Sequence, residues 1–107
     1  MIGKRELELM RPTGVIINTS RGGVINETAL AEALLAKTIA AAGLDVMEHE
    51  PPDPGDPLLQ IENLVITPHT AGPTLESIPK RAVNCFENIQ RVWNGDPPMW
   101  TAEYENL

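Results

Sequence analysis

The sequence is short of cysteine, of basic residues and of long apolar runs, and each shortage argues against a class of protein. The single cysteine, Cys85, cannot form an internal disulfide, which fits a reducing compartment. Eight basic against fifteen acidic residues give a formal charge of −7, which argues against binding to nucleic acid or to an anionic membrane. No apolar run reaches the roughly 18 residues of a membrane span, and residues 1–6 lack the apolar core of a signal peptide. We therefore expect a cytoplasmic protein with no nucleic acid, membrane or metal partner.

Helices and strands are expected to alternate along the 107 residues, which are enough for one small domain. The predicted elements are a helix at 3–10, a strand at 15–19, a helix at 27–37 capped by Asn26, strands at 40–46 and 64–67, and a final helix that ends before Gly95. The apolar residues of the first strand are consecutive, which is typical of a parallel strand covered on both faces. This alternation predicts an α/β fold with right-handed crossovers and one sheet of three parallel strands with flanking helices.

The final helix carries apolar residues at steps of three or four, which place them in one stripe. They are Leu75, Ile78, Ala82, Phe86, Ile89 and Trp93. Pro79 falls in the first turn if Ser77 caps this helix, but a helix that begins at Thr74 would be kinked there. Cys85 lies within the helix and is expected in or near the core. Residues 96–107 are expected to form a C-terminal tail.

Polar side chains follow each predicted strand. They are Thr19, Ser20 and Arg21 after the first strand, Asp45 and Glu50 after the second, and His69, Thr70, Ala71 and Gly72 after the third. The carboxyl ends of parallel strands share one edge of the sheet, where open α/β folds bind ligands. Taken alone, Arg21 fits a solvated turn and Asp45 fits a cap on local backbone donors. Glu50 by itself fits a solvent-facing loop acid, and His69 fits a structural residue beside a proline.

The same residues have a chemical reading when they are taken together. A guanidinium such as that of Arg21 can hold a carboxylate through two parallel hydrogen bonds. The His69 imidazole can exchange a proton with a substrate oxygen near neutral pH. A carboxylate on the far imidazole nitrogen would fix the tautomer and favour the charged ring. Such a set suits the interconversion of 2-oxo and 2-hydroxy acids, for which a cofactor must supply the hydride.

Three segments closely resemble the D-isomer-specific 2-hydroxyacid dehydrogenase family. They are Ile17–Glu27, which contains Thr-Ser-Arg-Gly-Gly; Ala42–Pro51, which contains Gly-Leu-Asp-Val and ends in Glu-Pro; and Thr67–Gly72, which reads Thr-Pro-His-Thr-Ala-Gly. The resemblance extends over residues 2–95. Because three separate motifs occur in the right order and spacing, it is far more specific than a single glycine pattern.

The resemblance implies a role for each cluster. Arg21 matches the arginine that binds the substrate carboxylate and carbonyl, His69 matches the general acid/base, and Glu50 matches its carboxylate partner. Asp45 matches the acid that holds the nicotinamide carboxamide. The stretches 19–21 and 69–72 match segments that line the nicotinamide. Ser20 stands where alanine is commoner, a mild change because this position meets the cofactor mainly through its backbone. The implied cofactor is NAD or NADP, with NAD favoured, and the implied substrate is a small 2-hydroxy or 2-oxo acid.

The chain also departs from the family pattern. Family members are much longer and have a separate substrate domain, and their dinucleotide domain begins with a Gly-x-Gly-x-x-Gly loop that seats the pyrophosphate. This loop is missing here, as is the residue that distinguishes NAD from NADP. We therefore expect residues 1–95 to form the C-terminal, nicotinamide-side half of a Rossmann-like doubly wound sheet.

An isolated half of this kind is expected to be an inactive fragment of an oxidoreductase. A second possibility is a non-catalytic module that pairs with or regulates a full-length relative, and a third is a fragment with no function of its own. The strand that should lie beside Val15–Thr19 is missing, which leaves an apolar sheet edge that can pair with another chain. We accordingly expect a homo-oligomer or pairing with a relative.

Overall fold

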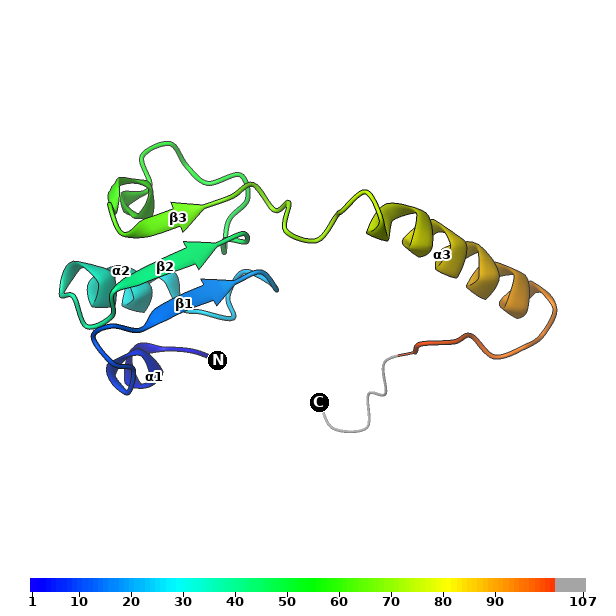
Figure 1. The fold of residues 1–107 in the computed structure, drawn as a ribbon, viewed down its shortest axis with the longest axis horizontal. Coiled ribbons are helices and arrows are strands. Elements are labelled where there is room, and N and C mark those ends of the chain that lie inside the picture. Colours follow the sequence, from blue (N-terminus) through cyan, green and yellow to red (C-terminus); the bar gives the residue numbers. More distant parts are fainter. Residues whose placement is uncertain (102–107) are drawn as a thin grey trace. The chain divides into compact units, whose positions relative to one another are not determined.

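The computed structural model describes residues 1–101, which fall into two compact units on either side of the Gly72–Pro73 bond. The first unit holds a sheet of three parallel strands in the order β1-β2-β3 (Figure 1). Strand β1 is Val15–Asn18, β2 is Ala41–Leu44 and β3 is Leu64–Ile66. The prediction of three parallel strands is confirmed. Each strand ends one or two residues before its predicted limit, although the Asp45 and Thr67 N–H groups still donate to the neighbouring strands at 2.9 Å.

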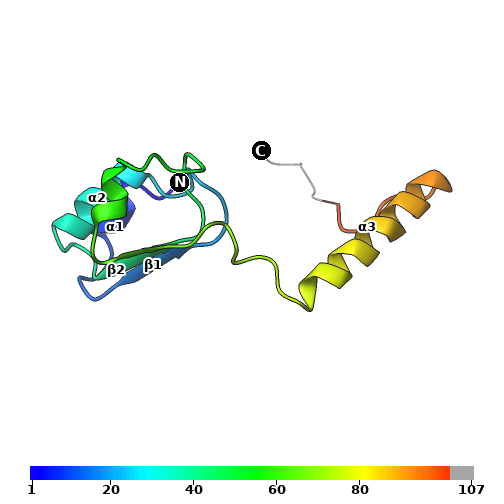
Figure 2. The same cartoon turned by 90° about the horizontal axis from the view of Figure 1, so that it is seen from above.

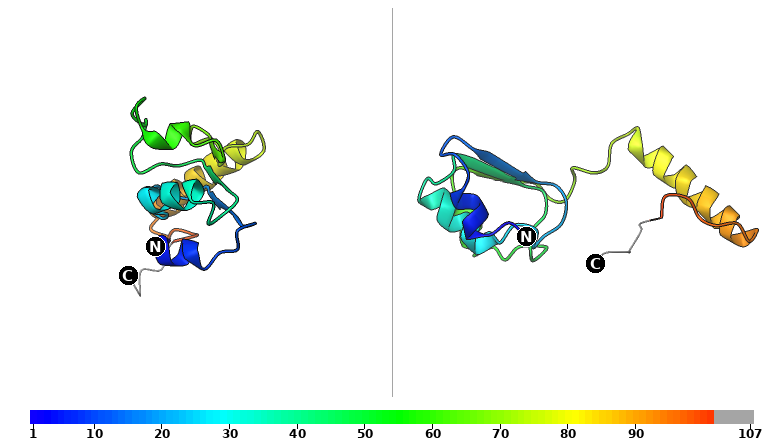
Figure 3. Two further views of the ribbon diagram at one scale, coloured as in Figure 1. Left: turned by 90° about the vertical axis from the view of Figure 1, so that its left-hand side faces the viewer. Right: turned by 90° about the horizontal axis from the view of Figure 1, so that it is seen from below.

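Two helices, α1 (Lys4–Glu8) and α2 (Glu27–Leu35), lie on the same face of this sheet (Figures 2 and 3). Helix α2 begins at Asn26, whose side chain accepts a hydrogen bond from the Ala29 N–H at 2.8 Å, so the predicted cap is confirmed. It ends two residues before the predicted limit, since Lys37 has a left-handed backbone with φ of 56°. The short 3-10 helix η1 (Pro57–Gln60) completes this layer.

The core of the first unit lies between the helices and the covered face of the sheet. Its most deeply buried side chains come from α1, α2 and the segments flanking the strands, and they are Leu7, Leu30, Leu34, Ile39 and Val46. The N-terminal segment is fixed to this core by a parallel bridge between Ile2 and Ile25. This packing holds the carboxyl ends of the three strands at one edge.

The opposite face of the sheet is open to solvent in the first unit. Val15, Ile17 and Val65 point to this face and are 56%, 70% and 66% exposed. The prediction that β1 is covered on both faces is therefore wrong for residues 1–72. The reason is topological: α2 and η1 both belong to right-handed crossovers running in the same direction, so both connections lie on one side of the sheet.

The second unit consists of helix α3 (Ser77–Trp93) and the segment that follows it. Pro79 lies in the first turn, and Thr74 and Ser77 exchange hydrogen bonds between side-chain oxygens and backbone N–H groups. None of the residues in α3 is buried, so the predicted apolar stripe is exposed and the prediction of a core position for Cys85 is wrong. No helix within residues 1–101 is both long and apolar enough to span a bilayer.

Part of the predicted C-terminal tail is ordered against α3. Asn88 accepts a hydrogen bond from the Met99 N–H at 2.8 Å and donates one to the Met99 carbonyl at 3.1 Å. Arg91 donates to the Pro97 carbonyl at 2.8 Å. The remainder of the predicted tail, residues 102–107, lies outside the described residues.

Candidate functional site

The predicted site residues from Thr19 to Gly72 all belong to the first unit, and hydrogen bonds join those that follow β2 and β3. His69 Nδ1 lies 2.9 Å from a carboxylate oxygen of Glu50, although the two residues are 19 positions apart. The other oxygen of Glu50 accepts a hydrogen bond from the Met47 N–H at 2.9 Å. These two contacts lower the pKa of Glu50, with the His69 hydrogen bond as the larger cause. With Nδ1 held by Glu50, Nε2 is the imidazole nitrogen left to exchange a proton with a ligand.

Asp45 shapes the turn that carries His69. Its buried carboxylate, only 4% exposed, accepts hydrogen bonds from the Thr67 hydroxyl, the Thr70 N–H at 2.8 Å and the Ala71 N–H at 2.9 Å. Thr67 and Thr70 bracket His69, whose φ of 54° lies in the left-handed region that non-glycine residues seldom adopt. The bonds from both sides hold this unusual backbone in place.

The same hydrogen bonds, chiefly that from Thr67, lower the pKa of Asp45. Asp45 therefore satisfies backbone donors, but these lie 25 and 26 residues away in the sequence and are not the local donors of its simpler sequence-based reading. Its predicted role toward the nicotinamide stays a prediction, and a carboxylate has lone pairs left for one further donor.

Arg21 follows β1 at the same edge of the sheet, in a turn that presses against the loop carrying Glu50. Its guanidinium is exposed and donates from Nη1 to the Ser20 carbonyl at 2.6 Å. A Cβ atom built on the next residue, Gly22, would lie 2.1 Å from the Met47 carbonyl oxygen. The Arg21 turn and the Glu50 loop are thus in backbone contact, with glycine as the residue that permits it.

This contact leads to a prediction about stability. Gly22→Ala should lower the free energy of unfolding by about 1–3 kcal/mol, because a backbone oxygen and its loop must move to admit the methyl group. Urea unfolding followed by circular dichroism measures this loss. Gly43→Ala is the matched control, since its Cβ would meet only the Ile17 side chain at 3.6 Å. Equal midpoints for the two variants would contradict the predicted backbone clash.

Asn18 is a site residue to which the sequence-based expectations assign no role. It ends β1, is 5% exposed, and bonds the turn that follows it through both ends of its amide group. Its Oδ1 accepts from the Ser20 N–H at 3.0 Å and from the Ser20 hydroxyl at 2.7 Å, and its Nδ2 donates to the Arg21 carbonyl at 2.9 Å. The sequence did carry a signal for the role of Asn18, because it is the polar residue that ends an otherwise apolar strand.

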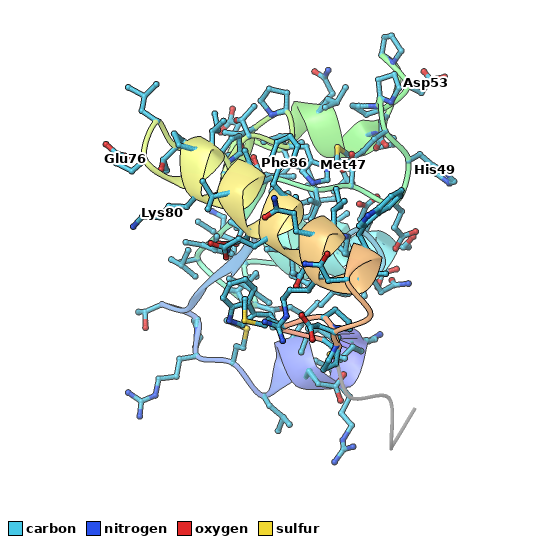
Figure 4. All side chains as sticks on the ribbon, turned by 90° about the vertical axis from the view of Figure 1, so that its right-hand side faces the viewer. Met47, His49, Asp53, Glu76, Lys80 and Phe86 are labelled. Atoms are coloured by element: carbon cyan, nitrogen blue, oxygen red, sulfur yellow. The ribbon has the colours of Figure 1, made fainter. Side chains whose placement is uncertain are left out.

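The loop after β2 is also tied to the start of α2. The Glu48 N–H donates to the Glu27 carboxylate at 2.6 Å, and the Glu27 N–H donates to the Glu48 carboxylate at 3.3 Å. Burial is the largest cause of a raised pKa for Glu27, and the nearby Glu48 carboxylate adds to it. His49, between Glu48 and Glu50, is exposed and points outward from its loop, as expected from the sequence (Figure 4).

A hollow of about 340 Å³ opens beside the Glu50–His69 pair. Its polar lining comes from Asp45, Glu50, Thr67 and His69, and its apolar lining from Met47, Pro51, Pro52, Ile66 and Pro68. A volume of this size can hold a small organic molecule. The side chains of His69 and Glu50 are 49% and 37% exposed, so this acid–base pair can exchange protons with a ligand placed beside the apolar wall.

Comparison with known proteins gives one consistent family. The sequence model described as "D-isomer specific 2-hydroxyacid dehydrogenase, NAD binding domain" matches residues 1–71. A glyoxylate reductase of Korarchaeum cryptofilum is 44% identical over 98 residues, which are 92% of this chain and 30% of that protein. A D-3-phosphoglycerate dehydrogenase of Archaeoglobus fulgidus is 42% identical over 97 residues, which are 91% of this chain and 18% of that protein. The chain thus spans less than a third of the length of these curated relatives.

Solved structures lead to the same family. A D-isomer specific 2-hydroxyacid dehydrogenase from Xanthobacter autotrophicus Py2, in complex with NADPH and MES, superposes with a TM-score of 0.83 at 34% identity. The match covers 95% of this chain and 41% of that one. An NADPH-dependent glyoxylate/hydroxypyruvate reductase from Sinorhizobium meliloti superposes with a TM-score of 0.77 at 35% identity, over 86% of this chain and 29% of that one.

Proposed function

The chain belongs to the D-isomer specific 2-hydroxyacid dehydrogenase family, and from this premise we propose that it forms the nicotinamide half of a site that interconverts small 2-oxo and 2-hydroxy acids. The observation that carries the proposal is the Glu50–His69 hydrogen bond of 2.9 Å at the carboxyl edge of the sheet. A proton donor held in this way serves hydride transfer to a carbonyl, which needs a proton on the oxygen as the carbon is reduced.

Each residue has a defined part in the proposed reaction. Arg21 binds the substrate carboxylate through its guanidinium fork and orients the 2-oxo group. His69 protonates the carbonyl oxygen from Nε2 during reduction and removes the hydroxyl proton during oxidation. Glu50 holds Nδ1 and stabilises the charged imidazole. The nicotinamide cofactor, when bound, supplies or accepts the hydride.

The described residues fit one end of a dinucleotide better than the other. Residues 19–20 and 70–72 are small and exposed, as a segment beside a flat ring requires, and the backbone N–H groups of Thr70 and Ala71 are held by the Asp45 carboxylate. The N-terminus of α2, by contrast, is occupied by the carboxylates of Glu27 and Glu48, which disfavour a phosphate group there. The phosphate end of the cofactor therefore needs a loop that this sequence does not supply, and the preference for NAD over NADP stays a prediction.

A hybrid enzyme tests the proposal. In it, this chain replaces the matching segment of the Korarchaeum cryptofilum glyoxylate reductase, whose remaining residues provide the rest of the protein. We expect the hybrid to oxidise NADH or NADPH in the presence of glyoxylate, and the isolated chain to show no activity above background. A folded hybrid that binds cofactor but turns over no 2-oxo acid would count against the proposed function. Robust activity of the isolated chain would count against its proposed incompleteness.

The pH dependence of the hybrid depends on Glu50. Because hydrogen bonds lower the pKa of Glu50, this carboxylate keeps its charge at more acid pH than an ordinary glutamate does, and that charge lies beside His69. Oxidation needs a neutral proton acceptor, so Glu50→Gln, which removes the neighbouring negative charge, should move the acid limb of the oxidation profile to lower pH. Profiles of kcat/KM measure the shift, and Glu48→Gln is the matched control. An unmoved limb in Glu50→Gln would remove Glu50 from this role.

A second function, that of a module which pairs with another copy or with a full-length relative, is favoured by the open side of the sheet. Strand β1 is an edge strand in the described sheet, and its exposed Val15 and Ile17 belong to an apolar face. Concentration-dependent association in sedimentation would support this function, whereas a folded monomer at all concentrations would oppose it. A cytoplasmic location and the absence of a nucleic acid partner remain predictions.

A further inference from the structure

Two polar side chains are buried within the described residues, and both lie at the carboxyl ends of neighbouring strands. Asn18, the last residue of β1, is 5% exposed, and Asp45, directly after β2, is 4% exposed. Their backbones are joined, because the Asp45 N–H donates to the Asn18 carbonyl at 2.9 Å. Each side chain bonds the loop that carries a proposed catalytic group, His69 for Asp45 and Arg21 for Asn18. Asn18 is paired with Leu44 in the sheet, so Asp45 lies one residue further along its own strand direction.

Both the oxygen and the nitrogen of the Asn18 side-chain amide have hydrogen-bond partners. Its oxygen accepts two hydrogen bonds from Ser20 and its nitrogen donates one to the Arg21 carbonyl, at distances between 2.7 and 3.0 Å. Aspartate at this place would set a carboxylate oxygen against the Arg21 carbonyl, and alanine would leave the Ser20 and Arg21 groups without these bonds. Only a side chain with both a donor and an acceptor at this reach serves the turn.

The hydrogen bonds continue from Asn18 to the guanidinium. Asn18 fixes the backbone and hydroxyl of Ser20, and the Ser20 carbonyl accepts a hydrogen bond from Arg21 Nη1 at 2.6 Å. Asn18 also holds the Arg21 carbonyl directly. Two sets of hydrogen bonds therefore restrict the exposed guanidinium. One joins Asn18 to the Arg21 backbone, and the other joins Asn18 to Ser20, whose carbonyl accepts from the guanidinium.

We propose that Asn18 is a positioning residue that orients Arg21 for the substrate carboxylate. The inference rests on the proposed function, since it takes Arg21 as the group that binds this carboxylate. A long arginine side chain on a loose turn would lose entropy on binding, and a misplaced guanidinium would hold the 2-oxo group away from the hydride and proton donors. Asn18 reduces the entropy lost on binding and keeps the guanidinium in place, and in this role it contacts neither substrate nor cofactor.

The kinetic test uses the hybrid enzyme. Asn18→Ala should raise the KM for glyoxylate by about tenfold or more, with a smaller loss in kcat and a KM for NADH or NADPH that stays within about twofold. Asn63→Ala is the matched control, because Asn63 also donates to a backbone carbonyl, that of Ala40 at 2.9 Å, but before β3 at the opposite edge of the sheet. It should leave both KM values unchanged. Equal kinetic effects of the two variants would overturn the inference.

A double-mutant cycle separates positioning from general destabilisation. If Asn18 acts through Arg21, Asn18→Ala should have almost no further effect on the KM for glyoxylate once Arg21 is already alanine. Additive losses in the double variant would show that Asn18 acts independently and would overturn the inference. If Asn18→Ala does not fold, Asn18→Asp takes its place in the cycle, because it keeps the acceptors for Ser20 and loses the donor to Arg21.

An exchange measurement on the 107-residue chain keeps this test apart from the proposed function. Asn18→Ala should speed amide hydrogen exchange at Ser20 by about tenfold relative to the β2 amides, because the N–H loses its acceptor. Unchanged exchange at Ser20 would overturn the inference even if the hybrid is active. An inactive hybrid with Asn18 in place, together with faster exchange at Ser20 in the variant, would instead contradict the proposed function alone.

Discussion

His69→Ala in the hybrid enzyme is expected to lower kcat by about a thousandfold, with the KM for glyoxylate changed by less than about threefold. His69 is the proton donor of the proposed reaction, and its loss leaves the developing alkoxide to be protonated by water. In the proposed reaction the substrate carboxylate is bound elsewhere, by Arg21, so ground-state binding should persist. Steady-state kinetics with glyoxylate and NADH or NADPH measure both quantities.

The control for this loss is the other histidine of the chain. His49 is exposed and lies one residue before Glu50. His49→Ala therefore changes the loop that carries Glu50, but it leaves the Glu50 and His69 side chains in place. We expect its kcat to match that of the unmodified hybrid. A comparable loss in the two variants would show that the loop, and not the His69 imidazole, limits turnover.

Arg21→Ala should have the second large effect, a fall in kcat/KM of about a thousandfold that comes mainly from KM. A guanidinium binds a carboxylate with two charge-assisted hydrogen bonds, and alanine replaces neither. Arg21→Lys should recover only part of the loss, since an ammonium group lacks the planar fork. Initial rates over a wide range of glyoxylate concentrations separate the two parameters.

Arg11→Ala provides the matched charge control, because Arg11 is exposed in the connection before β1 at the amino end of the strand. It removes the same charge from the same unit and should leave kcat/KM within about twofold. Small and equal effects of Arg21→Ala and His69→Ala would refute the assignment of separate binding and proton-transfer roles.

The sequence was sufficient for the features that depend on local patterns. Consecutive apolar residues flanked by turns identified all three strands, and their alternation with helices predicted the parallel sheet that the structure has. Asn26 was identifiable as a cap from its place before Glu27. The pairing of Glu50 with His69 followed from the family resemblance, and the structure sets these groups at 2.9 Å.

Features that depend on packing were predicted less well. The strands and α2 end earlier than expected, because Lys37 and the strand-end polar residues adopt loop conformations that no periodicity records. Cys85 was expected near the core from its place in an apolar helix, but an amphipathic stripe says only that one face can be buried, not that a partner element is present. Within residues 1–72, the second face of β1 is exposed for the same reason.

The sequence by itself determined the elements, their parallel order and the chemistry present at the strand ends, because these depend on residue types and short spacings. Only the tertiary structure decided which polar side chain supports which of the loops that carry Arg21 and His69. In β1, Val15 and Ile17 face solvent while Ile16 and Asn18 face the helices, and a run that is apolar on both faces does not reveal this alternation. The pleat therefore buries Asn18 under the Arg21 turn, just as the end of β2 buries Asp45 under the turn of His69.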